Sequence, residues 1–463
     1  MVNTVIIIGA GPAGIYAAYR LINNGYKNKI IIFDKGNSLN NRVCPISIGK
    51  VKSCVKCSPC NIMEGYGGAG SFSDAKFNIT NDFGGMLYKK IGKAPAISLM
   101  YEVDTINEIA FGDAQEFPKK YSSSNNKFKK ICLQNGLKLL DAEIRHLGTD
   151  KNRVVIQRLY DFLIKNNVEF HFNTEVKEIT KDNKILTNKN EWFSADKLII
   201  AVGRSGSHWL QNICKSLNIE TKSNNIDLGV RVELPYEVFS DLTDELYESK
   251  IIYTTKDYQD QVRTFCMNPK GIVVNENTNG IVTVNGHSFE NPEFHTENTN
   301  FALLVSQHFT EPFNDSNAYG ESIARLSNML GGGVIIQRFG DLIRCKRSTN
   351  GRIEKNTVIP TLKATPGDLS LVLPRRILND IIEMIYALDK IAPGTANDDT
   401  LLYGVEVKFY NMEVQVDNNL KINDNVYIIG DGSGITHSLS QAAASGLYVG
   451  NYIYDHFVDN TKI

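Results

Sequence analysis

The chain opens with apolar runs separated by glycines, and this pattern predicts a strand, a turn, a helix and a second strand. Val5 to Ile8 (VIII) is a short apolar run of strand type that leads into the glycine-rich segment 9–14 (GAGPAG). Ile15 to Leu21 (IYAAYRL) predicts a helix, which Gly25 ends. Ile30 to Phe33 is a second apolar run, so the first 34 residues predict one β–α–β unit.

The glycines of this unit follow the pattern G-x-G-x-x-G, and Asp34 closes the second strand 20 residues after the last of them. Gly9 allows a tight turn, Gly11 lets the backbone approach a pyrophosphate, and Gly14 lets the helix pack closely on the strand. The helix N-terminus offers N–H donors to phosphates. Asp34 can accept hydrogen bonds from a ribose. The unit therefore predicts a bound dinucleotide, and unrelated glycine-rich turns are the alternative.

A second glycine motif lies near the other end of the chain. Val426 to Ile429 predicts a strand that leads into Gly430-Asp431-Gly432, and Ser440 to Gly446 (SQAAASG) predicts a helix of small residues. This arrangement resembles the FAD-binding flavoproteins of the glutathione-reductase-like fold, whose late G-D motif holds the ribitol chain of FAD. The resemblance implies that Asp431 contacts the ribitol. It also implies that the N-terminus of the following helix faces the flavin, where reduction places negative charge.

The segment from Cys60 to Phe77 (CNIMEGYGGAGSFSDAKF) narrows the resemblance. It is similar to a group of bacterial and archaeal proteins described as uncharacterised FAD-dependent dehydrogenases, and the similarity covers nearly the full length. It implies that glycines of this segment pass the flavin, with Asp74 and Lys76 as further candidates for cofactor or substrate contacts. The residues expected to contact FAD are Gly9, Gly11, Pro12, Ala13, Gly14, Asp34, Lys35, Gly68, Ala69, Gly70, Val176, Ala201, Gly203, Arg204, Gly430, Asp431, Gln441 and Ala442.

The fold class expected is α/β, with a Rossmann-type FAD-binding domain (glutathione-reductase-like) and an inserted α+β substrate or cap domain. Strand-like runs recur after residue 226, and later segments, among them 300–307, predict helices. We expect the FAD-binding domain to comprise residues 1–225, which include a Cys-rich loop at 42–62, together with residues 395–463. The inserted domain takes residues 226–394. Residues 226–394 contain no second G-x-G-x-x-G, so we expect no dedicated NAD(P)H-binding domain of the disulfide-reductase type, and NAD(P)H stays open as an electron donor.

Composition adds few constraints to this picture. The chain has 463 residues, of which 42% are apolar and 22% charged, and its net charge is −1. This balance is ordinary for a globular protein and favours neither a nucleic-acid partner nor an anionic membrane. No apolar run approaches the roughly 18 residues that a spanning helix needs. The first apolar run has no basic stretch before it, so we expect no signal peptide and a cytoplasmic protein.

Four of the eight cysteines, Cys44, Cys54, Cys57 and Cys60, fall within 17 residues. Three interpretations remain open at this point. The spacing C-x2-C-x2-C, with Cys44 as a fourth thiolate, is compatible with a [4Fe–4S] cluster. Four thiolates also suffice for a structural zinc ion. The third interpretation is free thiols or a redox disulfide next to the flavin, with Cys57 and Cys60 as the catalytic pair.

Other candidates for chemistry are histidines and arginines. His437 follows the Gly-Asp-Gly motif and precedes the flavin-facing helix, so it is a candidate acid or hydrogen-bond donor, with helix capping as the alternative. His287 lies in the inserted domain and is a second catalytic candidate. Arg231, Arg263 and Arg344 are candidates for an anionic substrate, because a guanidinium pairs with carboxylates and phosphates through two hydrogen bonds.

Together these features predict an FAD-dependent oxidoreductase, a dehydrogenase or reductase that acts on a small molecule and carries a four-cysteine cluster near the flavin. The flavin supplies the redox chemistry. An electron-donor protein is a further expected partner. The first alternative is an FAD-dependent enzyme that modifies tRNA, which the neutral net charge weakens. The second is a flavin and thiol redox sensor.

Overall fold

The computed structural model describes residues 4–45, 48–50, 55, 57–73, 75–112, 116–246, 248–278, 280–289, 292–310, 312–313 and 315–457. Contacts divide the chain into two compact units. Unit 1 comprises Met1–Tyr121, Glu143–Lys222 and Asn411–Ile463, and unit 2 comprises Ser122–Ala142 and Ser223–Tyr410. Both units combine helices and strands, so the predicted α/β class is confirmed.

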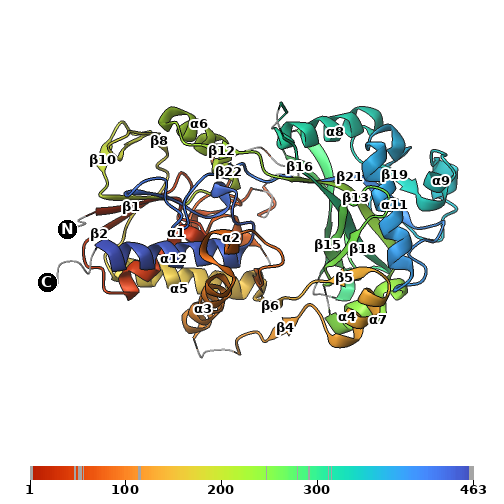
Figure 1. Cartoon of the computed structure of the whole chain (residues 1–463), viewed down its shortest axis with the longest axis horizontal. Coiled ribbons are helices and arrows are strands. Elements are labelled where there is room, and N and C mark those ends of the chain that lie inside the picture. Colours follow the sequence, from red (N-terminus) through yellow and green to blue (C-terminus); the bar gives the residue numbers. More distant parts are fainter. Residues whose placement is uncertain are drawn as a thin grey trace. The chain divides into compact units, whose positions relative to one another are not determined.

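Unit 1 is built on a five-stranded parallel sheet with the order β23-β11-β1-β2-β7. Figure 1 labels β1 and β2 of this sheet. Its strands are β1 (Thr4–Ile8), β2 (Lys29–Phe33), β7 (Glu169–His171), β11 (Lys197–Ile200) and β23 (Val426–Ile428). The apolar run Val5 to Ile8 predicts β1, because a strand that is buried on both faces of a parallel sheet is apolar at nearly every position. The β1–α1–β2 order of a Rossmann-type unit is present as predicted.

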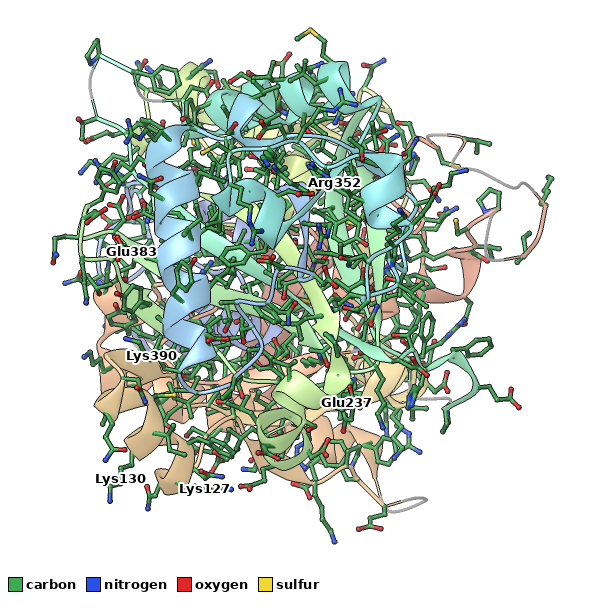
Figure 2. The ribbon with its side chains drawn as sticks, turned by 90° about the vertical axis from the view of Figure 1, so that its right-hand side faces the viewer. Lys127, Lys130, Glu237, Arg352, Glu383 and Lys390 are labelled. Carbon is green, nitrogen blue, oxygen red and sulfur yellow. The ribbon has the colours of Figure 1, made fainter. Side chains whose placement is uncertain are left out.

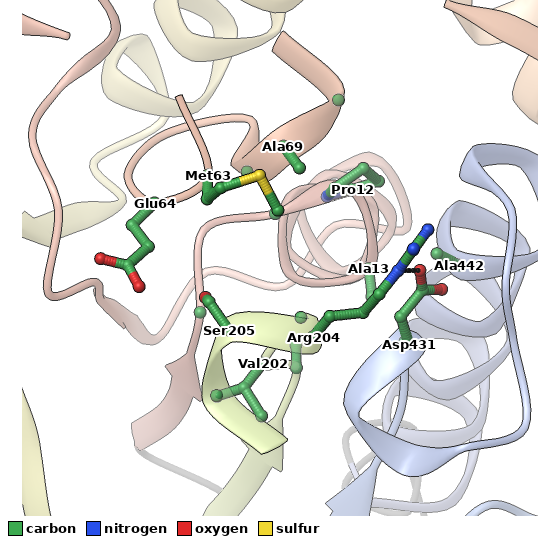
Figure 3. Close-up of a pocket in the computed structure, with 18 of the residues that line it drawn as sticks. Pro12, Ala13, Met63, Glu64, Ala69, Val202, Arg204, Ser205, Asp431 and Ala442 are labelled. Atoms are coloured by element: carbon green, nitrogen blue, oxygen red, sulfur yellow. Dashed lines mark ion pairs between the residues drawn. The ribbon is translucent and has the colours of Figure 1, made fainter. Parts of the chain in front are cut away.

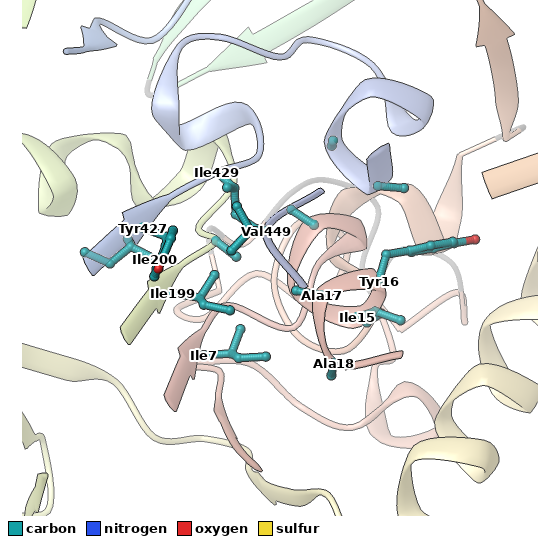
Figure 4. Packing of buried hydrophobic residues seen from close by; sticks show 14 of the residues in the cluster. Ile7, Ile15, Tyr16, Ala17, Ala18, Ile199, Ile200, Tyr427, Ile429 and Val449 are labelled. Atoms are coloured by element: carbon teal, nitrogen blue, oxygen red, sulfur yellow. The ribbon is translucent and has the colours of Figure 1, made fainter. Parts of the chain in front are cut away.

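The core of unit 1 lies between this sheet and two long helices, α1 (Pro12–Asn23) and α12 (Leu439–Phe457) (Figure 4). The two helices pack at very short range because glycines of α12 face α1. A Cβ atom at Gly446 would lie 2.2 Å from the carbonyl oxygen of Ala13, and one at Gly450 would lie 2.9 Å from that of Ala17. This close contact holds the end of the chain against its beginning.

Smaller elements complete unit 1. A three-stranded antiparallel sheet has the order β10-β9-β8, a second has the order β3-β6-β4, and β12 pairs with β22. The strands are β3 (Lys76–Ile79), β4 (Lys120–Ser122), β6 (Glu143–His146), β8 (Val176–Ile179), β9 (Lys184–Thr187), β10 (Trp192–Ser194), β12 (Thr221–Lys222) and β22 (Glu413–Val414). The helices are α2 (Tyr88–Ile91), α3 (Lys93–Phe111), α5 (Gly148–Lys165) and α6 (Ser207–Leu217), with short 3-10 turns η1 (Leu39–Asn41), η2 (Gly68–Phe72), η3 (Arg204–Gly206) and η6 (Asp431–Ser433).

Unit 2 is built on an eight-stranded sheet with the order β20-β19-β21-β13-β18-β15-β14-β5, in which every neighbouring pair but β19 and β20 is antiparallel. The strands are β5 (Leu137–Leu139), β13 (Ile226–Pro235), β14 (Ile251–Thr254), β15 (Gln261–Asn268), β18 (Asn298–Gln307), β19 (Ile335–Arg338), β20 (Thr365–Pro366) and β21 (Leu401–Lys408). A separate hairpin joins β16 (Ile272–Thr278) to β17 (Ile281–His287).

The helices of unit 2 are α4 (Asn126–Gln134), α7 (Tyr236–Leu246), α8 (Ser316–Gly331), α9 (Phe339–Ile343), α10 (Asn350–Ile353) and α11 (Arg375–Asp389), with short turns η4 (Pro292–Phe294) and η5 (Leu369–Leu371). Figure 2 shows charged side chains on the outer sides of these helices, such as Glu237 on α7, Arg352 on α10 and Glu383 on α11. The buried side of α11 carries apolar residues, among them Ile381 and Ile385, that pack on the sheet.

The two faces of the large sheet differ in polarity. Along β13, Leu228, Val230 and Val232 lie in the apolar core, whereas Arg231 and Glu233 point to the other face because side chains alternate along a strand. Both charged residues are 0% exposed. Unit 2 therefore has a buried polar face as well as an apolar one.

One predicted helix is wrong. Residues 300–307 form the greater part of strand β18, which lies between β13 and β15 in the middle of the sheet. The run Phe301 to Val305 is buried on both faces of the sheet, so the apolar and polar alternation of a half-exposed strand is missing. Periodicity alone cannot distinguish such a strand from a buried helix.

The boundaries of the two units differ from the boundaries of the expected domains 1–225, 226–394 and 395–463. Residues 395–410 lie in unit 2 because β21 pairs with β13 and β19. Residues 122–142 also lie there, because β5 pairs with β14 at the sheet edge. Within the ranges described above, no helix combines the length and apolar character needed to cross a membrane.

Candidate functional site

A cavity of about 450 Å³ lies in unit 1 at the carboxyl ends of β1, β2, β11 and β23 (Figure 3). The residues that end or directly follow these strands, Ile8, Phe33, Ala201 and Gly430, all line it. In open parallel sheets, ligands bind in the crevice outside the carboxyl ends of the strands. The cavity is therefore at the place where this architecture binds a nucleotide.

The loop between β1 and α1 shows why its glycines are needed. A Cβ atom at Gly14 would lie 2.0 Å from the carbonyl oxygen of Gly9, and one at Gly9 would lie 2.5 Å from that of Ala201. Gly11 is different, because a Cβ atom there would have no heavy atom of the described residues within 4 Å. Gly11 thus borders open space at the N-terminus of α1, as a pyrophosphate would require.

Asp34 is fixed at the end of β2 by backbone donors. Its Oδ2 accepts a hydrogen bond from the N–H of Ala10 at 2.9 Å, and its Oδ1 accepts one from the N–H of Gly36 at 2.8 Å. Burial raises the pKa of the Asp34 carboxyl, and the backbone donors partly offset this effect. The backbone of Gly65 is a third donor to this carboxylate, which has about four lone-pair sites, so one site is left for a ribose hydroxyl group.

Asp431 also lines the cavity, from the turn that follows β23 (Figure 3). Its Oδ2 lies 3.7 Å from Nε of Arg204, and its Oδ1 accepts a hydrogen bond from Oγ1 of Thr436 at 2.9 Å. Burial raises the pKa of the Asp431 carboxyl, whereas Arg204 lowers it. The preceding Gly430 has a φ of +71°, a backbone conformation that favours glycine.

The glycine-rich segment after the cysteines lies against the β1–α1 loop. The N–H of Gly67 donates to the carbonyl oxygen of Ala10 at 2.7 Å, and a Cβ atom at Gly68 would lie 3.3 Å from Cα of Gly11. Asn152 of α5 fixes the other side of the segment, because its Nδ2 donates to the carbonyl oxygen of Gly70 at 2.9 Å. Gly68, Ala69 and Gly70 line the cavity as a result.

Buried Arg42 holds the cysteine segment to the cavity wall. Its guanidinium donates to the carbonyl oxygens of Asn61, Ile62 and Tyr66 at 2.9, 2.7 and 2.6 Å. The same group lies 4.8 Å from the centre of the Phe72 ring. Burial lowers the pKa of Arg42 to about 10, so it remains a cation at neutral pH. Arg42 therefore fixes the backbone that joins the cysteine segment to the glycine-rich segment.

Cys57 is exposed and Cys60 is half-buried, and neither forms a disulfide within the described part of the chain. Cys54 lies outside the described residues, as does Asp74. Among the residues that the structure describes, no three His, Cys, Asp or Glu side chains are placed to hold one metal ion. A site that needs Cys54 is not tested by this result, so the four-cysteine cluster stays a prediction.

All but two of the predicted cofactor contacts line the cavity, and the two exceptions have structural roles. Gly14 packs under Gly9, as described above. Gln441 holds a neighbouring loop to α12, because its Nε2 donates to the carbonyl oxygen of Phe83 at 3.2 Å and its Oε1 accepts from the N–H of Leu87 at 3.3 Å. The residues that line the cavity as predicted are Gly9, Gly11, Pro12, Ala13, Asp34, Lys35, Gly68, Ala69, Gly70, Val176, Ala201, Gly203, Arg204, Gly430, Asp431 and Ala442.

The two histidine candidates are in different units. His437 lines the cavity, and its backbone N–H donates to the carbonyl oxygen of Gly84 at 2.9 Å. His287 pairs with Ile272 in the β16–β17 hairpin of unit 2 and is not part of this cavity. Cys57 and Cys60 do not line it either, although Met63 and Glu64 of the same segment do.

Trp209 lines the cavity from α6, and no motif in the sequence singled it out. Its indole N–H is buried and has no hydrogen-bond acceptor among the described residues. A buried donor without a partner at a cavity wall suits a ligand that supplies an acceptor. Its position shortly after the Ala201–Gly203 turn is the signal that could have drawn attention to it. The open space at Gly11, the carboxylates and Trp209 together fit a dinucleotide.

Matches to protein-family models indicate which dinucleotide the cavity suits. Residues 225–409 match the family described as "FAD-dependent protein, C-terminal domain-like", and residues 127–233 match "Pyridine nucleotide-disulphide oxidoreductase". Residues 4–64 match "Glucose inhibited division protein A". The chain is an FAD-dependent oxidoreductase. The predictions of an enzyme and of FAD are thereby confirmed, whereas the glutathione-reductase-like branch stays a prediction.

Relatives of this flavoenzyme are distant. An uncharacterized protein of Clostridium beijerinckii is 25% identical over 480 residues, which cover 98% of this chain and 81% of that protein. Among solved structures, 2,6-dihydroxypyridine-3-hydroxylase from Arthrobacter nicotinovorans is 11% identical, with a TM-score of 0.41 over 100% of this chain and 85% of that one. Tetracycline destructase Tet(51) is 12% identical, with a TM-score of 0.34 over 99% and 84% of the two chains.

Proposed function

We propose that this flavoenzyme is a dehydrogenase or reductase for a small molecule, with FAD held in the cavity of unit 1. The observation that carries the proposal is the convergence on one cavity of the open glycine Gly11, the carboxylates of Asp34 and Asp431, and the N-terminus of α12. These are the groups that phosphates, a ribose, a ribitol and a flavin ring require. When bound there, FAD supplies hydride and single-electron transfer.

The residues of the chain have separable tasks in this proposal. Backbone N–H groups at the start of α1 bind the phosphates, and Asp34 accepts hydrogen bonds from the ribose. Asp431 accepts hydrogen bonds from the ribitol, and Arg204 keeps that carboxylate charged by its proximity. The first turn of α12 presents its positive dipole end to the cavity, where Leu439 and Ala442 line the wall.

His437 is the residue that we assign to proton transfer. It lies in the cavity wall directly before α12, and Ser438 next to it accepts a hydrogen bond from the N–H of Gln441 at 3.3 Å. Because Ser438 supplies this capping contact, the imidazole is not required for it. An imidazole at a cofactor cavity is suited to exchange a proton with a substrate near neutral pH.

A reductase or dehydrogenase is favoured over an oxygen-using enzyme by the position of the cysteine segment. Glu64 lines the cavity and accepts a hydrogen bond from the N–H of Cys60 at 2.8 Å. Cys60 is only four residues before Glu64, which lines the cavity. Thiols or a metal cluster this near the cavity along the chain suit electron transfer under reducing conditions. The exposed Cys57 would let a second protein or a small thiol exchange electrons with the segment.

Anaerobic purification followed by reduction and reoxidation of the flavin tests this function. We expect about one FAD per chain, reduction by an organic donor or a nicotinamide, and reoxidation by quinone or dye acceptors faster than by oxygen. The variant His437→Asn should keep its FAD and lose most of the turnover, because a general acid or base contributes about 10²- to 10⁴-fold. Absence of flavin would disprove the site, and oxygen consumption coupled to a hydroxylated product would disprove the reaction.

A second candidate function, modification of tRNA, has one observation in its favour, which is the match of residues 4–64 to glucose inhibited division protein A. Binding of total tRNA to the holoenzyme, followed in about 50 and 200 mM salt, separates the two functions. Tight binding that weakens strongly with salt would favour the RNA substrate. Equal, weak retention at both salt concentrations would leave the small-molecule function.

A further inference from the structure

A ring of cations surrounds one aromatic side chain on the polar face of unit 2. Nζ of Lys250, Cζ of Arg263 and Nζ of Lys408 lie 5.1, 5.2 and 5.8 Å from the centre of the Phe265 ring. Arg231, on the neighbouring part of the same face, donates from its guanidinium to the carbonyl oxygen of Cys266 at 3.1 Å. Four cationic side chains thus gather around two consecutive residues of β15.

Carboxylates near these cations do not balance their charge. Glu406 receives two hydrogen bonds from Arg231, both at 2.8 Å, and the same carboxylate lies 3.1 Å from Nζ of Lys408. Arg263 forms its own pair with Asp227. Counted over these described residues, three cations meet two carboxylates, which leaves one positive charge in excess. Lys250 adds a cation whose carboxylate neighbour, Glu248, lies 3.8 Å away.

An excess charge at this place is costly, because the surroundings exclude most water. The side chains of Arg231 and Glu406 are both 0% exposed, and that of Lys408 is 18% exposed. Charges that are withdrawn from water are normally paired. The cations around Phe265 nevertheless retain some exposed surface, which a buried structural ion pair would not need. An anion from solution can therefore reach the group and complete its charge balance.

The backbone at the ring is distorted in a way that is common at binding sites. The pairing of β15 with β18 shifts register between Phe265 and Asn268, and Cys266 has a φ of +48°. Such bulges and left-handed residues change the direction of side chains and are frequent next to functional sites. Beside the ring, Nδ2 of Asn300 is buried and has no acceptor in the described part of the chain, although its Oδ1 accepts from Arg231 at 2.9 Å.

We propose that Lys408, Arg263 and Lys250 around Phe265 bind a small organic anion with a single carboxylate. One excess positive charge matches a monocarboxylate, and the half-buried Phe265 supplies an apolar neighbour for its carbon skeleton. This anion site lies in unit 2 alone and is separate from the proposed function of the cavity in unit 1.

Equilibrium dialysis of the purified holoprotein with benzoate tests the site, with benzamide as a neutral probe of the same shape. We expect benzoate to bind at low salt, benzamide to bind at least about 10-fold more weakly, and sodium chloride to weaken benzoate binding. Lys408→Gln should weaken benzoate binding by about 10-fold or more, and Lys408→Arg should largely keep it. The control Arg325→Gln changes an exposed cation of α8 that pairs with Glu321 and should leave binding unchanged.

Three results would overturn the proposal. Equal binding of benzoate and benzamide would show that charge is not recognised, and unaltered binding by a folded Lys408→Gln variant would show that the ring is not the site. Tighter binding of inorganic phosphate than of benzoate would overturn the monocarboxylate class. If Lys408→Gln does not fold, Lys250→Gln takes its place with the same expected loss, because it removes another cation of the ring. FAD content, measured on the same samples, reports separately on the cavity of unit 1.

Discussion

The carboxylate of Glu64 accepts a hydrogen bond from the backbone N–H of Cys60 at 2.8 Å, so a cysteine is attached to a residue that lines the cofactor cavity. The second oxygen of this carboxylate lies 2.7 Å from Nζ of Lys35, which follows Asp34, the acid that we propose binds the ribose. The redox-capable segment and the nucleotide site are thus joined through one side chain.

Replacement of Glu64 by alanine should loosen the cysteine segment. We expect Cys57 and Cys60 to react several-fold faster with iodoacetamide, because a charge-assisted hydrogen bond of about 1.5–3 kcal/mol is lost. Glu64→Gln is the matched control, since its amide oxygen can still accept from the N–H of Cys60. Mass spectrometry of the alkylated peptides measures both rates. Equal rates in the alanine variant and the wild type would contradict the role of Glu64.

Replacement of Gly11 by valine should remove FAD without unfolding the protein. A Cβ atom at this position meets no neighbouring atom within 4 Å in the described residues, so a side chain there begins in open space, where we propose that the pyrophosphate lies. We expect FAD affinity to fall by at least about 10-fold while the melting temperature of the apoprotein stays the same. Gly351→Ala, at a similarly open position in α10, is the control. Full FAD content in Gly11→Val would place the cofactor elsewhere.

The Arg231–Glu406 pair should behave as a buried ion pair. Arg231→Met leaves the Glu406 carboxylate buried without its two guanidinium hydrogen bonds, and we expect the free energy of unfolding to fall by about 3–5 kcal/mol. The double variant Arg231→Met/Glu406→Leu should recover a large part of this loss. Chemical denaturation of the three proteins measures it. A double variant no more stable than the single one would show that packing, not charge, dominates at this place.

Asp380 should make stability depend on pH between about 4 and 6. Burial, with Asp260 as a neighbouring carboxylate, raises the pKa of Asp380 to about 6 from an ordinary value of 3.8. A carboxyl with a raised pKa binds its proton more tightly in the folded protein. Its contribution to stability is therefore fully present below pH 3.8 and is lost as the pH rises through 6.

The variant Asp380→Asn tests this assignment. At pH 7 we expect its free energy of unfolding to be about 3 kcal/mol higher than that of the wild type, and at pH 4 nearly the same, because one pKa unit corresponds to about 1.4 kcal/mol. Glu237→Gln, on the outer side of α7, is the control and should show no such difference (Figure 2). A constant difference between Asp380→Asn and wild type across this pH range would contradict it.

The cofactor cavity could be predicted from the sequence because its contacts lie within short motifs. Gly9 to Ala13, Gly68 to Gly70 and Gly430-Asp431 are each local, and the carboxyl ends of parallel strands bring them together. Gly14 and Gln441 belong to the same motifs but face the protein, and no local pattern distinguishes the two sides of a loop. Trp209 has no motif, and only the packing of α6 brings it to the wall.

Less of the structure of unit 2 could be predicted from the sequence, for physical reasons. The run Phe301 to Val305 is apolar at every position, so it does not reveal whether a strand or a helix buries it. The cation ring around Phe265 joins residues that are separated by more than 140 positions in the chain. Arg263 could be suggested as an anion ligand by its residue type, but its neighbours depend on the strand order.

The division of unit 1 into three chain segments has a consequence for protein synthesis. Strand β23 and helix α12 close the parallel sheet and cover α1, yet they follow β11 by more than 220 residues and are therefore synthesised much later. Until then, Ile199 and Ile200 of β11 have no β23 neighbour, and Ala13 and Ala17 of α1 have no partner helix. The nascent chain therefore carries an open sheet edge and an uncovered apolar helix face while the segment between β11 and β23 is made. Such surfaces favour aggregation until β23 and α12 have been synthesised.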